Sequence, residues 1–519
     1  MVNIGNMSDS IQTTREFRMK LLNDRYRPSY HFAIPEDLGL PGDPNGAFYA
    51  NGRYHLMYLY DNRSDGFRWG HISSLDLIHW RHHPDAIIPG GGDGGCFSGG
   101  AFVDDDNTVY LTYWGLPVKD EGMSGSGICI AKSSDRHYEK WEKFDSPVLQ
   151  CNEDGIHETV DSKGEKLYLG CADPSNIWKK DGVYYMQTGN LCVLNKYGRD
   201  ETSSPKMKGD WVDLFQSKDL KKWDYVDRFY QRDMSNKWTD ESEDDMCPSF
   251  LPLPVSRQGG SESGKHLQLF ISHNKGCQYY IGSYTEDELL LETHGRMSWV
   301  DNTFFAPEAL IDDKGRQIMW AWLLDNPADE LQNGWSGVFG LPRTLWLGED
   351  NTLRMAPVDE LKTLRYNEKR FSSMRINDGD RVELSGINGE SSEIKLVITP
   401  GSAKKMGLKV RASADEEEET LLYYDTESNQ LVFDSTKSGV MGRMVSEAAP
   451  FKLNAFEKLE LTIFIDKSVI EVFANDRQAI TRRVYPVRLE STGVYLFSEG
   501  GDAAFDTIQV WEMMPSNPY

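Results

Sequence analysis

The fold is decided by a stretch that reads Asp43-Pro-Asn-Gly-Ala-Phe-Tyr-Ala-Asn-Gly-Arg-Tyr-His-Leu-Met-Tyr58. The pair Asn51-Gly52 tolerates the positive φ angles of a tight two-residue turn, and aromatic and apolar residues flank it on both sides. The stretch therefore predicts a β-hairpin. Similar turn pairs recur along the chain while long helical periodicity is scarce, so we expect an all-β protein.

Four later stretches repeat this pattern. They read Ser98-Gly-Gly-Ala-Phe-Val-Asp-Asp-Asp-Asn-Thr-Val-Tyr-Leu-Thr-Tyr113, Asp173-Pro-Ser-Asn-Ile-Trp-Lys-Lys-Asp-Gly-Val-Tyr-Tyr-Met186, Cys247-Pro-Ser-Phe-Leu-Pro-Leu253 with His266-Leu-Gln-Leu-Phe-Ile271, and Ala306-Pro-Glu-Ala-Leu-Ile-Asp-Asp-Lys-Gly-Arg-Gln-Ile-Met-Trp-Ala-Trp322. Between them a Ser/Asp turn leading to a Trp recurs, at Ser74–Trp80, Ser134–Trp141 and Ser217–Trp223. Five hairpins with interleaved outer strands predict a five-bladed β-propeller. Because the spacing is irregular, the repeat alone also permits a sandwich or a barrel.

The ends of the chain have a different texture. Apolar residues between Ser10 and Asn23 fall on one stripe, so residues 1–27 are expected to form a helical N-terminal extension. The propeller is predicted over residues 28–350. Alternating strands fill the last part of the chain and predict a β-sandwich over residues 366–519.

The composition narrows the partners. The net charge of −25 disfavours nucleic acid and anionic membranes and suits a neutral substrate, although solubility alone also explains it. The seven cysteines are scattered without a C-x-x-C pair, which favours free thiols in a reducing compartment. With no apolar signal segment near Met1, we expect a cytoplasmic protein. The sequence predicts no metal and no cofactor, and it carries no signal for an oligomeric state.

The repeat also predicts where the chemistry lies, because the inner strands of a propeller line a central funnel. The equivalent positions hold Asp43, Ser98, Asp173, Cys247 and Ala306. Asp-Pro also caps turns, but Asp43 and Asp173 share the same offset of eight residues from their turn pairs, which favours a shared site. Glycosidic cleavage needs one carboxylate as nucleophile or base and one carboxyl as acid. Aromatic and hydroxyl groups that suit a sugar pocket accompany them, namely Trp69, Phe97, Ser98 and Trp335.

These motifs make the sequence similar to glycoside hydrolase family 32, the invertases, inulinases and levanases. The resemblance runs from Tyr30 to Trp511 and rests on Gly42-Asp-Pro-Asn-Gly46, Trp69-Gly-His71, Phe97-Ser-Gly99, Ala172-Asp-Pro174, Phe305-Ala-Pro307, Leu341-Pro-Arg343 and Asp466-Lys-Ser-Val-Ile-Glu-Val-Phe473. It implies a propeller followed by a sandwich, with Asp43 as nucleophile and Asp173 as stabiliser of the transition state. It also places Asn45 among the substrate-binding residues.

The sequence departs from the family pattern within the expected pocket. Gly42, Leu59 and Ala172 stand where the family has an Asn, a Gln and an Arg that contact fructose. In Asp244-Asp-Met-Cys-Pro248, Met246 occupies the position of the family's general acid, and a thioether cannot transfer a proton. We expect Asp245 to replace it, because strand alternation places Asp245 on the same face as Cys247. Glu308, Glu243 and Asp244 are alternatives, as is the loss of the acid altogether.

The resulting hypothesis is a retaining glycoside hydrolase that cleaves terminal β-fructofuranosidic bonds in sucrose and fructan oligosaccharides. One alternative is a glycosidase or transglycosylase acting on another furanoside or an unusual fructose linkage, since lost polar contacts alter discrimination between sugars. A second alternative is a catalytically inactive sugar-binding protein.

Overall fold

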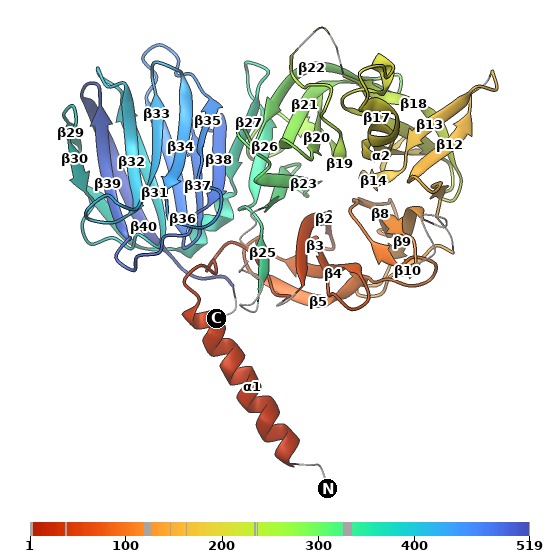
Figure 1. Ribbon diagram of the computed structural model, residues 1–519, viewed down its shortest axis with the longest axis horizontal. Helices are drawn as coiled ribbons and strands as arrows, with labels where there is room; N and C mark the ends of the chain where they lie inside the picture. Colours follow the sequence, from red (N-terminus) through yellow and green to blue (C-terminus); the bar gives the residue numbers. More distant parts are fainter. Residues whose placement is uncertain are drawn as a thin grey trace. The chain divides into compact units, whose positions relative to one another are not determined.

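The computed structural model describes residues 4–36, 39–118, 126–145, 147–161, 163–232, 235, 237–324 and 335–517. The chain forms two compact units. One comprises Met1–Leu40, Leu323–Leu341 and Asp359–Tyr519, and the other comprises Pro41–Trp322 and Pro342–Val358. Strands dominate both units, as Figure 1 shows.

Within its described residues, the second unit holds five antiparallel sheets arranged as blades (Figure 1). The first three are β2(Leu40–Ala50), β3(Arg53–Asp61), β4(Phe67–Ser74), β5(Trp80–Ile87); then β6(Gly95–Cys96), β7(Ala101–Val103), β8(Val109–Leu116), β9(Gly127–Ser133), β10(Glu142–Lys143), β11(Leu149–Gln150); then β14(Ala172–Pro174), β15(Trp178–Lys180), β16(Val183–Gly189), β17(Trp211–Ser217), β18(Trp223–Gln231). The last two are β19(Met246–Pro254), β20(Glu262–Ser272), β21(Gly276–Thr285), β22(Glu288–Arg296); then β23(Phe304–Ile311), β24(Gln317–Leu323), β26(Arg343–Leu347), β27(Leu353–Pro357). The prediction of five blades is confirmed.

Smaller elements precede the third blade or lie between its strands β16 and β17. They are the two-stranded sheet β12(Ile156–Val160)–β13(Lys166–Gly170) and the short helices α2(Leu191–Val193), η1(Leu194–Gly198) and η2(Pro205–Met207).

Local chemistry explains the repeat. The turn residues Asn51 and Gly52 both have positive φ angles, 51° and 74°, as the hairpin prediction requires. At the outer corners the Ser/Asp motif caps its own turn: the Asp76 carboxylate accepts hydrogen bonds from the backbone N–H groups of Ile78 and His79. The carboxylate of Asp219 does the same in the third blade. In these two blades the turn at the outer corner is therefore encoded by a local Ser/Asp motif.

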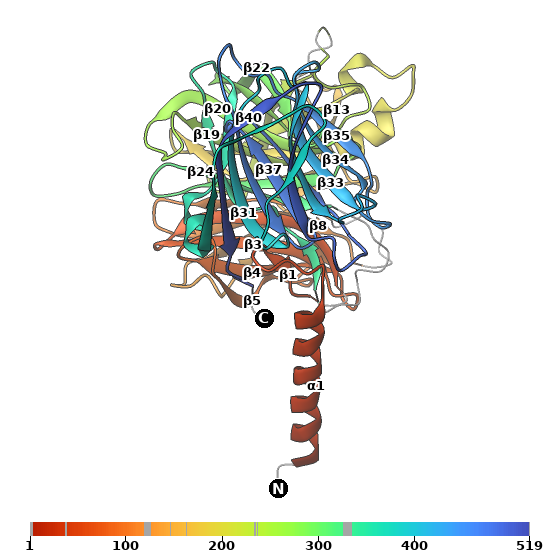
Figure 2. The ribbon, with the colours of Figure 1, turned by 90° about the vertical axis from the view of Figure 1, so that its left-hand side faces the viewer.

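The first unit contains the helix α1(Ile4–Asn23) and a sandwich of two sheets (Figure 2). One sheet contains β28(Arg365–Phe371), β29(Met374–Ile376), β31(Ser391–Thr399), β36(Leu459–Asp466), β37(Val469–Ala474), β38(Gln478–Arg483) and β40(Ala503–Met513). The other contains β30(Arg381–Glu383), β32(Lys405–Ala412), β33(Glu419–Asp425), β34(Gln430–Lys437), β35(Ser446–Pro450) and β39(Gly493–Glu499). The short helix η4(Asp359–Leu364) precedes them. The predicted β-sandwich is confirmed.

The unit boundaries differ from the predicted 28–350 and 366–519, because two segments pack in the unit that contains the sandwich. Strand β1(Ala33–Ile34) pairs with β25(Ser336–Val338), and both lie in this unit. The imidazole of His31, 0% exposed, lies between two carboxylates, 2.9 Å from Asp466 and 3.1 Å from Glu471. A buried ion-paired histidine therefore ties the N-terminal segment to strands more than 400 residues away.

None of the helices in the described part of the chain combines the length and the apolar character that a membrane crossing requires.

Candidate active site

Two carboxyl groups and a thiol meet where the inner strands β2, β14 and β19 begin. The Cys247 Sγ lies 3.6 Å from Asp43 Oδ2 and 3.4 Å from Asp173 Oδ2. Asp43 is 8% exposed and Asp173 is 7% exposed, so both keep a small opening to solvent. The equivalent residues Asp173, Cys247 and Ala306 share a left-handed backbone, with φ of 38°, 50° and 47°. The structure thus brings together the two aspartates whose repeat positions predicted a common site.

The two carboxyl groups influence one another electrostatically. Burial, followed by the negative charge of Asp43, raises the pKa of Asp173 to about 6. Burial also raises the pKa of Asp43, although hydrogen bonds from the Ser98 hydroxyl and the Cys247 thiol favour its charged form. Burial and both carboxylates raise the pKa of Cys247 well above its usual value, so this side chain stays a thiol and donates.

Three predicted binding residues brace this centre. Asn45, 2% exposed, donates from Nδ2 to the carbonyl oxygen of Asp43 at 3.3 Å and accepts from the Gly99 N–H at 3.2 Å. Trp69 is fully buried, and its Nε1 donates to the Phe97 carbonyl oxygen at 3.1 Å. The Phe97 ring is half-buried against Phe67. Asn45 and Trp69 support the hairpin, and the contact of all three with a sugar stays a prediction.

Trp335 lies in the unit that contains the sandwich and is 1% exposed. Its indole N–H donates to Asp24 at 2.7 Å, and the Arg483 guanidinium lies 5.3 Å from its ring centroid. These contacts give Trp335 a packing role within its own unit, and a role in binding substrate stays a prediction.

The side chain of Asp245, the favoured replacement for the missing acid, contacts Tyr230, which lies outside the cluster of Asp43, Asp173 and Cys247. It is 0% exposed, and the Tyr230 hydroxyl donates to its Oδ2. Burial raises the pKa of Asp245 well above its usual value. The alternation argument fails here because Asp245 precedes β19, Cys247 has φ of 50°, and the register of β19 shifts between Met246 and Ser249.

The other three candidate acids are engaged in different ways. Glu243 forms two hydrogen bonds with the Arg296 guanidinium, at 2.8 and 2.9 Å. Glu308 is 5% exposed and accepts the backbone N–H of Ala47 at 2.7 Å. The Asp244 carboxylate lies 2.7 Å from His273 Nδ1.

His273 is the residue that the sequence reasoning missed. It begins the turn between β20 and β21, outside the repeated hairpin and corner motifs, and its side chain is 49% exposed. Burial lowers its pKa, but the hydrogen bond and charge of Asp244, with the charges of Asp173 and Asp43, offset this and raise the pKa above 6.5. The one signal in sequence was its place two residues beyond Ile271, where the second run of the fourth hairpin ends.

The residues that depart from the family pattern in the expected pocket are apolar and buried. Ala172 is 0% exposed, Leu59 is 4% exposed and Met246 is 2% exposed. A Cβ atom added to Gly42 would lie 2.9 Å from the Leu59 side chain, and one added to Gly189 would lie 2.6 Å from Met246 Sδ. Leu59 and Met246 therefore fill space beside two glycines.

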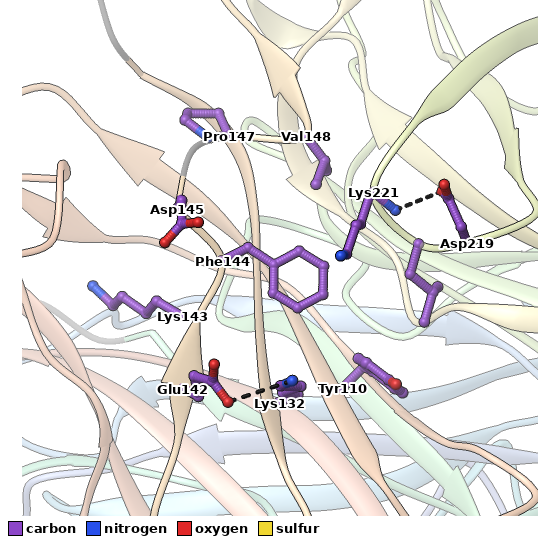
Figure 3. Close-up of a pocket in the computed structure, with 11 residues that line it drawn as sticks. Tyr110, Lys132, Glu142, Lys143, Phe144, Asp145, Pro147, Val148, Asp219 and Lys221 are labelled. Atoms are coloured by element: carbon purple, nitrogen blue, oxygen red, sulfur yellow. Dashed lines mark hydrogen bonds and ion pairs between the residues drawn. The ribbon is translucent and has the colours of Figure 1, made fainter.

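A separate surface cavity of about 370 Å³ lies between the second and third blades (Figure 3). Tyr110, Phe144 and three lysines, Lys132, Lys143 and Lys221, are among the residues that line it. Neither Asp43 nor Asp173 is one of them, so this cavity is distinct from the carboxyl pair. Across the described residues, no group of three or more His, Cys, Asp or Glu side chains has the arrangement of a metal site.

Comparison with known proteins extends over both units. The family model described as glycosyl hydrolases family 32 N-terminal domain matches residues 31–357, and the corresponding C-terminal model matches residues 360–512. The chain is 28% identical to a sucrose-6-phosphate hydrolase of Zymomonas mobilis, over 96% of this chain and 94% of that protein. It is 27% identical to a fructan 1-exohydrolase of Bromus pictus, over 92% and 85%.

Solved structures show the same fold. Fructan 1-exohydrolase IIa from Cichorium intybus superposes with a TM-score of 0.79 at 24% identity, covering 95% of this chain and 98% of that one. Sucrose-6-phosphate hydrolase from Lactobacillus gasseri gives a TM-score of 0.74 at 22% identity, covering 98% and 97%. With both family models matched along most of its length, the chain belongs to glycosyl hydrolase family 32.

Proposed function

We propose that the protein is a retaining glycoside hydrolase that releases terminal fructose from β-fructofuranosides such as sucrose and fructan oligosaccharides. The observation that carries this proposal is the convergence of Asp43 and Asp173 on one thiol. Family membership supports it, and so do the relatives, whose names refer to the hydrolysis of sucrose 6-phosphate and fructan.

The chemistry follows from the positions of the two carboxylates. An Asp43 oxygen attacks the anomeric carbon C2 of the fructosyl group while the bond from C2 to the glycosidic oxygen breaks. The leaving oxygen takes a proton, and the Asp173 carboxylate stabilises the positive charge that develops on the sugar ring. Water then attacks C2 and releases Asp43. Two displacements at the same carbon retain the β configuration.

A different furanoside or a transferase reaction is the second candidate, and the apolar pocket departures favour it. Leu59, Ala172 and Met246 present no hydrogen-bonding side-chain group to a hydroxyl. A site that has lost such groups discriminates differently between sugars.

Incubation with sucrose, 1-kestose, inulin, levan and aryl furanosides tests the proposal, with wild type compared to Asp43→Asn and Asp173→Asn. We expect fructose release by wild type and a loss on the order of 10⁴-fold in Asp43→Asn. If only a non-fructose furanoside were cleaved, the proposed substrate would be wrong and the proposed mechanism would stand. Sugar binding without turnover would reject the enzymatic proposal.

We also propose that the protein works in a reducing compartment such as the cytoplasm. Its seven cysteines are all free, and Cys247 serves the site as a thiol. Subcellular fractionation tests this, and recovery of the protein outside the cell would contradict it.

A further inference from the structure

The site lacks a proton donor at the position where the resemblance places one. Met246 is 2% exposed and its sulfur lies against Gly189. The leaving sugar departs as an alkoxide unless its glycosidic oxygen receives a proton, so another group has to act as the acid. Each of the four carboxyl candidates already has a partner. Asp245 accepts from Tyr230, and Glu308 accepts from the backbone of Ala47. Glu243 is paired with Arg296, and Asp244 is paired with His273.

His273 lies at the end of the fourth blade that is nearest to Cys247. Strand β20 pairs antiparallel with β19, and Met246 is opposite Ile271, so the turn that starts at His273 lies beside the end of β19 that carries Cys247. Cys247 in turn contacts both Asp43 and Asp173.

Three contacts fix the orientation of His273. Its Nδ1 lies 2.7 Å from Asp244 Oδ2, and its backbone N–H donates to Asp244 Oδ1 at 3.1 Å. Its carbonyl oxygen accepts from Asn302 Nδ2 at 2.7 Å. Asp244 itself is almost fully buried, at 2% side-chain exposure, while the imidazole is half-exposed. Nδ1 is therefore committed to Asp244, and the imidazole presents Nε2 as its second proton-carrying atom.

The imidazole also interacts with the reacting groups. Its charge favours the ionised forms of Asp43 and Asp173, and their charges favour the imidazolium. Such mutual effects fall with distance, and they agree with the strand pairing, which puts His273 beside the end of β19 that carries Cys247.

We propose that His273 is the general acid and base of this enzyme and that Asp244 is its positioning residue; this rests on the proposed glycosidase function. In the first step Asp43 forms a bond to C2, the bond from C2 to the glycosidic oxygen breaks, and that oxygen takes the proton from Nε2. In the second step neutral Nε2 accepts a proton from water, the water oxygen bonds to C2, and the ester bond to Asp43 breaks. Fructose leaves and the imidazolium is restored.

Leaving-group dependence separates this role from a structural one. We expect His273→Gln to lose about 10²–10⁴-fold in kcat/KM on sucrose, the range for a lost proton-transfer group. On p-nitrophenyl β-D-fructofuranoside, whose leaving group departs as a stable anion, kcat/KM is expected to fall by less than about ten-fold. Azide, which needs no base, should restore kcat in this variant and give fructosyl azide as product.

The matched control is His79→Gln. His79 is paired with Asp76 by the same kind of contact, at 2.8 Å, on an exposed outer corner. His79→Gln should leave kcat/KM unchanged on both substrates. Asp43→Asn should abolish the hydrolysis of both.

Two results would overturn the role of His273 while leaving the proposed function intact. One is near wild-type sucrose hydrolysis by His273→Gln, and the other is an equal loss on both substrates without azide rescue. Inactivity of wild type on both fructosides would reject the proposed function itself, and His273 with it.

Discussion

The side chain of Leu59 lies against the α-carbon of Gly42, with Leu59 Cδ2 only 2.9 Å from the place that a Cβ atom at position 42 would occupy. These are two of the positions at which the family resemblance implies fructose-reading amides. Each change therefore accommodates the other, because a side chain at 42 needs the space that Leu59 fills. Gly42 and Leu59 thus depart from the family pattern together and pack against each other.

This contact predicts coupling between the two positions. Gly42→Asn alone should lower the free energy of unfolding by about 1–3 kcal/mol through overpacking. In a Leu59→Gln background the same change should cost less, with a coupling energy of about 0.5–3 kcal/mol. Chemical denaturation of the four proteins of the cycle measures this, and additive costs would contradict the packing account. We expect the double variant to hydrolyse sucrose better than either single variant.

The pH dependence of kcat/KM should be bell-shaped. On the acid side, activity should rise as the Asp43–Asp173 pair ionises, with Asp173 at about 6. On the alkaline side, activity should fall as His273 loses its proton, because a general acid works only when protonated. The groups that face His273 are Asp244, Asp173 and Asp43, and Asp244 raises its pKa. Asp244→Asn should therefore move the alkaline limb to lower pH. An unmoved limb would mean that His273 does not set it.

Removing the buried carboxyl groups that are candidates for the general acid should have little effect on turnover. Burial raises the pKa values of Asp245 and Glu308 well above their usual values, which favours the neutral form of each carboxyl group. Asp245→Asn and Glu308→Gln replace each carboxyl group by an uncharged amide of nearly the same shape. We expect each to keep sucrose hydrolysis within about ten-fold of wild type, less than the loss of a proton-transfer group costs. A collapse in Asp245→Asn, with His273→Gln unaffected, would return the acid to Asp245.

The buried histidine of the unit that contains the sandwich predicts an alkaline loss of stability. Burial lowers the pKa of His31, but hydrogen bonds to Asp466 and Glu471 outweigh this and raise it to about 9. Its folded pKa is above its unfolded one, so its contribution is complete below about pH 6.5 and is lost as pH rises through about 9. The contribution is on the order of 3 kcal/mol. Denaturation of wild type and His31→Gln at pH 6.5 and 9 checks this, and a gap between them that does not narrow with pH would contradict it.

Much of the fold was predictable because its determinants are local. Asn51-Gly52 encodes a hairpin in two residues, and the equal offset of Asp43 and Asp173 from their turns encodes their meeting. The boundaries of the two units were harder to predict. Strand β1 pairs with β25 about 300 residues later, and a two-residue strand carries no sequence pattern that indicates this pairing.

The remaining parts of the site depend on geometry that a sequence pattern does not carry. Strand alternation placed Asp245 beside Cys247, but the left-handed backbone at Cys247 breaks the alternation. His273 enters the site from a turn, and turns have no periodicity from which to infer a direction. Trp69 matched a sugar-stacking residue by type, yet the structure buries it completely under the hairpin.

The central claim is that Asp43 attacks the anomeric carbon of a β-fructofuranoside. Proton NMR of the first minutes of 1-kestose hydrolysis tests it most directly, because it identifies the fructose anomer before mutarotation. We predict that β-fructofuranose appears first with wild type and that Asp43→Asn releases none. Initial release of the α anomer, or undiminished release by Asp43→Asn, would contradict the account.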